Sequence, residues 1–131
     1  AVGVLVAVMP HQPLADLLVE RGYIGRGAPL LKRVMALPGQ QVCRTGNDIS
    51  VDAVPLGSAL DRDRMGRVLP TWQGCRRIAN GDIFLMNPAV SDSLDGRYFG
   101  PIPARTVIGM AVPLLTDEAG DGHFGWRAAT R

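Results

Sequence analysis

The chain has 131 residues, which is enough for one domain with a single apolar core. Its 47% apolar and 20% charged residues are ordinary proportions for a folded globular domain. The net charge of +2 comes from interspersed basic and acidic residues, so the chain has no clustered basic face and no nucleic-acid partner is expected.

The first part of the chain predicts two strands and one helix. Residues 4–9 form an apolar run rich in β-branched side chains that stops at Pro10, which predicts a buried strand. Residues 13–22 predict the only helix, because proline is favoured at its start, leucines share one face and glycine can close it. Residues 30–37 predict a second apolar strand, interrupted by a Lys-Arg pair and ended by Pro-Gly.

Further strands are predicted in the rest of the chain. Residues 41–44 and 49–54 alternate in character on either side of a Thr-Gly-Asn-Asp turn signal, which predicts a hairpin. Residues 55–72 are polar and lack a pattern, so we expect an extended excursion. Residues 83–86 and 107–115 are apolar and predict two more strands.

The domain organisation follows from these elements. Residues 1–115 are predicted to form one domain, and residues 116–131 to form a loosely ordered tail. The 16 glycines and 10 prolines, spread among many short strands, predict a mainly β fold with closed or heavily coiled sheets and one short helix. No apolar stretch approaches the roughly 20 residues of a transmembrane helix. Because the chain begins at Ala1 inside an apolar run, we expect it to be a piece of a longer protein.

The chain contains two cysteines, Cys43 and Cys75, far apart in sequence. Neither histidine, His11 or His123, lies near them, so no zinc site and no metal is expected. The same two histidines give no basis for a Ser/His/Asp triad. The cysteines are either two buried thiols of a cytosolic protein or one disulfide that closes the excursion between them.

Lys32 is unusual because it lies in the middle of an apolar strand. Side chains alternate along a strand, so Leu30, Lys32 and Val34 share one face and Arg33 points to the other. One interpretation is an edge strand blunted by two solvated cations. The other is a desolvated lysine whose pKa is low enough for a neutral amine to take a proton from a serine hydroxyl. Arginine stays charged, so Arg33 cannot serve as that base.

Two segments carry a resemblance to a known family. Residues 31–39, Leu-Lys-Arg-Val-Met-Ala-Leu-Pro-Gly, resemble the lysine motif of type I signal peptidases. Residues 91–103, which contain Ser-x-Asp-Gly-Arg-Tyr-Phe-Gly, resemble the final conserved motif of that family. Residues 81–87 are similar to the strand that leads into this motif. The order and spacing of all three fit the family.

Within that family the resemblance is to the conjugative-transfer branch, the TraF-type peptidases. The segments that carry it are residues 21–24, 29–32, 66–70 and 74–76. The resemblance covers residues 3–115 and implies a signal-peptidase-like coiled β domain without a cofactor. It also favours the disulfide for the two cysteines, since it implies an extracytoplasmic location.

The resemblance implies a role for each matching residue. Lys32 would be the general base, and Ser93 would hydrogen-bond its amine and orient it. Asp95 and Arg97 would form a salt bridge that holds the final motif in place, with Tyr98 packed beneath it. On the residues alone, Asp95 and Arg97 could equally be a turn ion pair worth less than about 1 kcal/mol.

The chain departs from the family pattern at three positions within the matching segments. Gln40 stands where aspartate is usual after Leu-Pro-Gly, and Val4 where Gly-Asp usually opens the first strand. Gly96 stands where serine is usual, which is expected to loosen the final motif slightly. None of these changes removes the base.

The family's nucleophilic serine lies in a segment before the first strand, and no such segment occurs here. Every serine of the chain follows Lys32 in sequence; the four are Ser50, Ser58, Ser91 and Ser93. The chain as given is therefore predicted to be catalytically inactive, with its nucleophile and membrane anchor supplied upstream of Ala1 in the parent protein.

The resemblance implies a serine endopeptidase of the Ser/Lys type, acting at the periplasmic face of the bacterial inner membrane. Its partner would be an extended peptide, either a pre-protein or a pilin precursor that the enzyme cleaves and then cyclises. This peptide is expected to add as a strand beside residues 4–9. Two alternatives remain: a cytosolic self-cleaving repressor-type Ser/Lys protease, and a non-catalytic β module that binds peptides.

Overall fold

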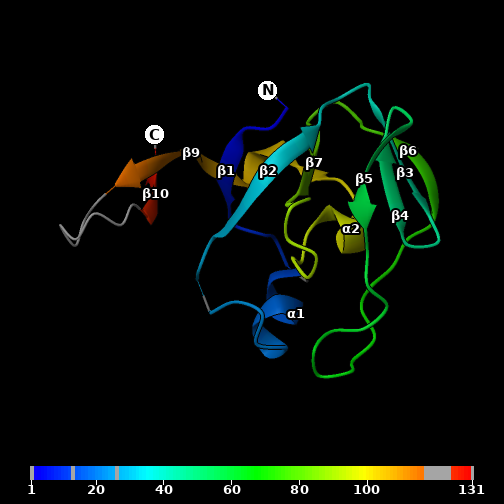
Figure 1. Ribbon diagram of the computed structural model, residues 1–131, viewed down its shortest axis with the longest axis horizontal. Coiled ribbons are helices and arrows are strands. Elements are labelled where there is room, and N and C mark those ends of the chain that lie inside the picture. Colours follow the sequence, from blue (N-terminus) through cyan, green and yellow to red (C-terminus); the bar gives the residue numbers. More distant parts are fainter. Residues whose placement is uncertain (1, 13, 26, 117–124, 131) are drawn as a thin grey trace.

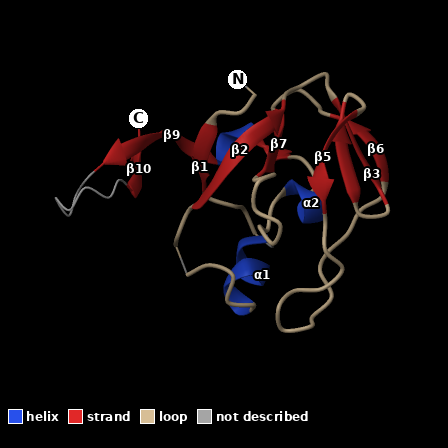
Figure 2. Cartoon of the chain, viewed as in Figure 1, coloured by secondary structure: helices blue, strands red, loops and turns tan. Residues whose placement is uncertain are grey.

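The computed structural model describes residues 2–12, 14–25, 27–116 and 125–130. It confirms the mainly β class predicted from the sequence: two antiparallel sheets lie side by side, with little helix (Figure 1). The predicted strands all form, and they account for most of the regular structure (Figure 2). Within the described residues, no helix has the length and apolarity that a bilayer crossing needs.

The larger sheet has six strands in the order β10-β9-β1-β2-β7-β8. In chain order these strands are β1 (Leu5–Val8), β2 (Leu30–Ala36), β7 (Asp82–Met86), β8 (Ile102–Pro103), β9 (Val107–Thr116) and β10 (Gly125–Thr130). β1 pairs with β2 on one side and with β9 on the other. The expectation that a substrate strand adds beside residues 4–9 is therefore wrong, because both edges of β1 are already occupied by backbone hydrogen bonds.

The smaller sheet has four strands in the order β5-β4-β3-β6. They are β3 (Gln41–Thr45), β4 (Asp48–Val51), β5 (Val54–Ser58) and β6 (Gly74–Arg77). β3 and β4 form the predicted hairpin, in which Thr45 pairs with Asp48 across a two-residue turn. β5 occupies the beginning of the segment predicted as an excursion, so the irregular part shortens to residues 59–73.

Two helices and one 3-10 turn complete the described elements. They are α1 (Leu14–Glu20), α2 (Gly96–Phe99) and η1 (Ala104–Thr106). α1 is the helix predicted over residues 13–22, although Pro13 itself lies outside the described residues. α2 corrects the expectation of a single helix: it is one turn long, and the Asp95 side chain caps it by accepting from the Arg97 N–H. A helix this short has no periodic apolar pattern that could have predicted it.

β10 differs from the loosely ordered tail expected over residues 116–131. Gly125–Thr130 pairs with β9 in an antiparallel register that runs from Gly125 opposite Thr116 to Thr130 opposite Ala111. This strand forms by backbone pairing with β9, the strand that precedes it in the chain, although its own sequence has no alternating apolar pattern that would predict a strand. Residues 117–124 and 131 lie outside the described part of the chain.

β7 separates two clusters of buried apolar side chains. Its alternating side chains face opposite ways: Phe84 and Met86 pack with the smaller sheet, whereas Ile83 and Leu85 pack with β1 and β2. Both faces of β7 are therefore buried, and its four apolar residues are at most 7% exposed. β7 ends at Met86, shortly before the final sequence motif begins at Ser91, so the buried strand limits where that motif can lie.

The structure joins Cys43 and Cys75 in a disulfide between β3 and β6, where the two residues lie directly opposite each other. We expect unreduced protein to resist alkylation and to gain two labels only after reduction, as measured by mass spectrometry. Loop-closure entropy over a separation of 32 residues predicts that replacing both cysteines by alanine costs about 3–4 kcal/mol of stability. Two freely labelled thiols in unreduced protein would contradict the pairing.

Candidate active site

β2 places Lys32 inside the molecule and Arg33 outside it. β2 lies between β1 and β7, so it is a central strand and not the blunted edge that the Lys-Arg pair could have indicated. The side chains of β2 alternate strictly between buried and exposed over its first half. Lys32 is only 8% exposed. Arg33 is exposed, and its Nη1 donates to the Gly3 carbonyl at 2.9 Å.

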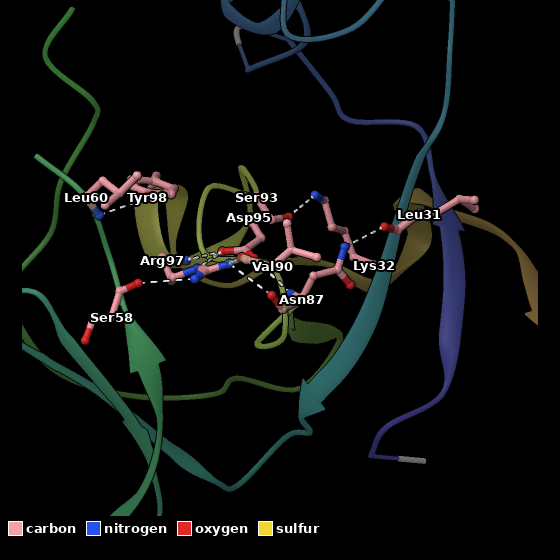
Figure 3. A network of polar contacts seen from close by, with 10 residues as sticks. All are labelled: Leu31, Lys32, Ser58, Leu60, Asn87, Val90, Ser93, Asp95, Arg97 and Tyr98. Atoms are coloured by element: carbon pink, nitrogen blue, oxygen red, sulfur yellow. Dashed lines mark hydrogen bonds and ion pairs between the residues drawn. The ribbon is translucent and has the colours of Figure 1, made fainter. Parts of the chain in front are cut away.

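The Lys32 amine is held by the final motif. Lys32 Nζ donates to Ser93 Oγ at 2.5 Å, and both side chains are buried (Figure 3). Burial is the main influence on the pKa of Lys32 and lowers it from 10.5; the Asp95 carboxylate opposes this effect, and the Arg97 guanidinium adds to it. The structure thus brings together Lys32 and Ser93, which are 61 residues apart in sequence.

Asp95 and Arg97 form a buried, bidentate ion pair. Arg97 Nε donates to Asp95 Oδ1 and Arg97 Nη2 to Asp95 Oδ2, both at 2.9 Å. The side chains are 0% and 1% exposed, which excludes the solvated turn pair that the residues alone allowed. The remaining guanidinium donors reach the carbonyls of Ser58, Asn87 and Val90 at 3.1, 3.1 and 2.7 Å. Arg97 therefore joins three chain segments around one point.

Tyr98 and Arg44 connect this motif to the smaller sheet. Tyr98 is 2% exposed, and its hydroxyl accepts from the Leu60 N–H at 2.9 Å. Arg44, on β3, is also 2% exposed; its guanidinium lies 6.0 Å from the centre of the Tyr98 ring, and its Nη1 donates to the Arg97 carbonyl. The sequence did not single out Arg44, because its partner at Arg97 is 53 residues away.

Gly96 is packed too tightly for any side chain. A Cβ atom at this position would lie 2.7 Å from the Leu85 carbonyl oxygen and 2.5 Å from Phe84 Cε1. The packing therefore differs from the expectation that Gly96 loosens the motif. Because Gly96 has no side chain, α2 can lie directly on β7. We expect Gly96→Ala to lower the free energy of unfolding by about 1–3 kcal/mol, measured by urea denaturation. Gly25→Ala is the matched control, because a Cβ at this exposed position would meet nothing within 4 Å and the backbone φ is not positive.

A cavity of about 410 Å³ opens beside Lys32. Its lining is mostly apolar, with a charged wall from the excursion and the segment after α1; the residues are Leu18, Arg21, Gly22, Tyr23, Ile24, Leu30, Lys32, Leu60, Asp63, Arg64, Met65, Arg67, Leu69, Asp92 and Leu94. The volume is within the range of ligand-binding pockets. A peptide side chain in this cavity would therefore lie against the Lys32 side chain.

The polar and charged side chains of this cavity wall form hydrogen bonds and ion pairs with one another. Tyr23 Oη donates to Asp63 Oδ2 at 2.5 Å, and Arg67 Nε donates to the same oxygen at 2.7 Å. Desolvation alone would raise the pKa of Asp63, but these bonds and the Arg67 charge outweigh it and hold the pKa well below its usual range. Asp63 is thus an ionised structural group. Asp92, the other carboxylate of the lining, pairs with Arg64, whose hydrogen bond and charge lower the pKa of Asp92. Lys32 is therefore the lining residue best suited to accept a proton.

Two other kinds of site, a metal centre and a histidine-based triad, were considered for the described residues. No group of three or more His, Cys, Asp or Glu side chains gathers there as metal ligands. His11 lines a separate cavity of about 220 Å³ that includes neither Lys32 nor Ser93. His123 lies outside the described part of the chain.

Comparison with known proteins gives consistent matches. The sequence profile of the family described as signal peptidase, peptidase S26, matches residues 2–115. The chain is 39% identical over 125 residues to a probable conjugal transfer protein TraF of Sinorhizobium fredii, covering 88% of this chain and 65% of that protein. It is 32% identical over 116 residues to a plasmid transfer protein TraF of Escherichia coli, covering 82% and 65% respectively.

A signal peptidase is also found among the similar proteins of known structure. The crystal structure of a signal peptidase I from Enterococcus faecalis V583 has a TM-score of 0.48 and 17% identity, covering 84% of this chain and 94% of that one. The chain spans about 65% of the length of the two TraF relatives.

Proposed function

Because the chain belongs to the signal peptidase family, peptidase S26, we propose that it is the base-bearing part of a Ser/Lys endopeptidase. Membership confirms the family predicted from the two sequence motifs, and it supports a peptidase-type function. We further propose that the parent protein processes signal peptides or a conjugative pilin precursor at the periplasmic face of the inner membrane.

One observation carries this proposal: a buried lysine amine is bonded to Ser93, in a segment that a buried ion pair holds, since the Ser93 N–H and Arg97 Nη2 both donate to the Val90 carbonyl. A lysine on a solvated edge strand would stay protonated near neutral pH. Burial lowers the pKa of Lys32 and makes a neutral amine accessible. The Cys43–Cys75 disulfide also supports an extracytoplasmic setting over that of a cytosolic repressor-type protease.

The proposed mechanism uses Lys32 as general base. The neutral Nζ takes the proton from a serine hydroxyl that a segment upstream of Ala1 supplies, and the serine oxygen attacks the scissile carbonyl carbon. The resulting tetrahedral intermediate expels the amine, which takes the proton from Lys32 and leaves an acyl-enzyme. Water then attacks the ester, with Lys32 accepting its proton. The serine oxygen leaves and takes that proton back from Lys32, which releases the acid and restores the neutral amine. If the amino terminus of the same peptide attacks instead, the product is a cyclic pilin.

In this mechanism Ser93 is an orienting residue and not the nucleophile. Its Oγ is buried and bonded to the Lys32 amine, so it fixes the direction of the amine lone pair. The peptide partner is proposed to bind as an extended segment whose side chain enters the cavity beside Lys32. The predominantly apolar lining of that cavity suits an uncharged side chain.

The test compares the chain of 131 residues with a longer protein that carries the upstream segment. We expect the shorter chain to leave a fluorogenic signal-site peptide uncut, because its serines all follow Lys32. The longer protein is expected to cleave the same peptide, and replacing its upstream serine by alanine should abolish cleavage. Cleavage by the shorter chain would show that the nucleophile has been assigned wrongly.

A further inference from the structure

The backbone ladder between β2 and β7 stops one step before Lys32. Arg33 pairs with Met86 in an antiparallel register. Continuing this register by two residues would place Leu31 opposite Pro88. β7 ends at Met86, so no regular pairing reaches Leu31. The residue that precedes Lys32 therefore lies where the sheet would be expected to open.

The Leu31 carbonyl faces this gap. Val34 forms backbone hydrogen bonds with the two residues just before β1. Its N–H donates to the Val4 carbonyl at 2.9 Å, and its carbonyl accepts from the Gly3 N–H at 2.6 Å. Successive residues of a strand direct their backbone groups to opposite edges, so those of Leu31 point towards β7. A ladder partner at Pro88 could not donate to it, because proline has no N–H.

The Asn87 side chain takes the place of that missing donor. Its Nδ2 donates to the Leu31 carbonyl at 3.1 Å (Figure 3). The Asn87 backbone is held from the other side: its N–H donates to Asp95 Oδ2 at 2.9 Å, and its carbonyl accepts from Arg97 Nη2 at 3.1 Å. Asn87 thus connects the buried ion pair to the β2 backbone through three hydrogen bonds.

We propose that Asn87 is a positioning residue for Lys32: its side-chain amide replaces the N–H that Pro88 lacks and holds β2 against the segment that carries Ser93. This proposal rests on the proposed function, since it concerns the placement of the catalytic base. Two connections then join β2 to this segment, one at the Leu31 backbone and one at the Lys32 amine. The first fixes the start of a long flexible side chain, and the second fixes its end.

Loss of the Asn87 amide is expected to let this end of β2 fray. The Lys32 amine would then spend time away from Ser93 and in contact with water. Displacement of a catalytic group by about 1 Å can slow a reaction roughly 100-fold. Only two of the residues that line the cavity, Leu30 and Lys32, belong to β2, so the affinity of the cavity for peptide should change little.

The test uses the longer protein with its upstream segment. Asn87→Ala is expected to lower kcat about 10- to 100-fold with KM within about twofold. The pKa of the Lys32 amine, followed by side-chain NMR, should rise towards its ordinary value as burial decreases; Asp95 and Arg97 are the charges that also act on it. Asn80→Ala, at an exposed asparagine in the turn before β7, is the matched control and should leave both quantities unchanged.

Rescue separates positioning from general packing. Asn87→Ala combined with Pro88→Ala restores a backbone N–H opposite Leu31 and should recover most of the lost kcat. A folded Asn87→Ala protein with unchanged kcat and Lys32 pKa overturns the proposal, and so does a loss that Pro88→Ala fails to recover. If Asn87→Ala does not fold, Asn87→Asp keeps the size and the backbone bonds but removes the donor. Full activity, or failure to fold, in that variant also overturns the proposal.

Failure of the positioning role of Asn87 can be told apart from failure of the proposed function by comparing Asn87→Ala with Lys32→Ala. If Lys32→Ala itself keeps its activity in the longer protein, then Lys32 is not the base and the proposed function fails. If Lys32→Ala is inactive while Asn87→Ala is fully active, only the positioning role fails.

Discussion

Replacing Lys32 by alanine in the longer protein is expected to lower kcat/KM for a signal-site peptide by about 10²- to 10⁴-fold. Lys32 is 8% exposed and its amine donates to Ser93 Oγ at 2.5 Å, so this substitution removes the proposed acceptor of the serine proton. Lys32→Arg should fail as fully, because a guanidinium does not deprotonate under these conditions. The measurement is steady-state cleavage of a fluorogenic peptide.

Two variants serve as controls for this result. Arg33→Ala should retain nearly all activity, because its side chain is on the exposed face of β2 and bonds only the Gly3 carbonyl among described groups. Ser93→Ala should have an intermediate effect, since it removes orientation but leaves the base. A protein that stays active with Lys32→Ala and becomes inactive with Arg33→Ala would refute the Ser/Lys dyad. If Ser93→Ala is as inactive as Lys32→Ala while the alanine variant of the upstream serine stays active, Ser93 is the nucleophile.

The lowered pKa of Lys32 also fixes the direction of two pH effects. Peptidase activity should rise as pH increases through this pKa, because the neutral amine is the form that can act as the proposed general base. Between the lowered value and 10.5 the unfolded chain binds more protons than the folded one, so the free energy of unfolding rises with pH in that window. Lys32→Met should abolish both effects, and it should preserve or increase stability at neutral pH because no charge is then buried.

Replacing Arg97 by methionine is expected to lower the free energy of unfolding by about 3–5 kcal/mol. The substitution leaves the Asp95 carboxylate buried without its partner, and it also removes the donors to the carbonyls of Ser58, Asn87 and Val90. Because Asp95 and Asn87 support the segment that carries Ser93, peptidase activity should be lost as well. Urea denaturation of the purified protein measures the stability change.

Arg64→Met is the matched control for this variant. Arg64 also pairs with an aspartate, Asp92, but its side chain is 87% exposed, so the change should cost less than about 1 kcal/mol. Combining Arg97→Met with Asp95→Leu should recover part of the stability lost by Arg97→Met alone, because no unpaired charge then remains buried. Equal effects of Arg97→Met and Arg64→Met would show that burial of the pair has no energetic role.

The sequence predicted the part of the site that depends on strand alternation. The order Leu30, Lys32, Val34 on one face of a strand indicates a lysine among apolar neighbours, and the structure has this arrangement. The pattern could not tell a central strand from an edge strand. That distinction depends on whether β7, 50 residues further on, pairs with β2, and such pairing is a property of the whole sheet.

The residues missed by the sequence analysis act through distant backbone groups. Arg44 donates to a carbonyl 53 residues away, and Asn87 donates to one 56 residues away. A lone arginine on a hairpin and a lone asparagine before proline have common alternative explanations as solvated or turn residues. For Asn87, the neighbouring Pro88 was the available signal, because a proline at the end of a strand leaves its partner without a donor.

The hydrogen bond from Arg44 to the Arg97 carbonyl affects whether the site could be grafted onto another protein scaffold. The two sheets lie side by side in Figure 1 and look separable. The ion pair nevertheless depends on the smaller sheet too, because Arg97 also donates to the Ser58 carbonyl at the end of β5. A minimal design that grafts only β1, β2, β7 and α2 onto another scaffold would leave the Arg97 guanidinium and carbonyl short of partners. The smaller sheet therefore belongs to the structural unit that holds the candidate site, and a transplant would have to carry it together with the larger one.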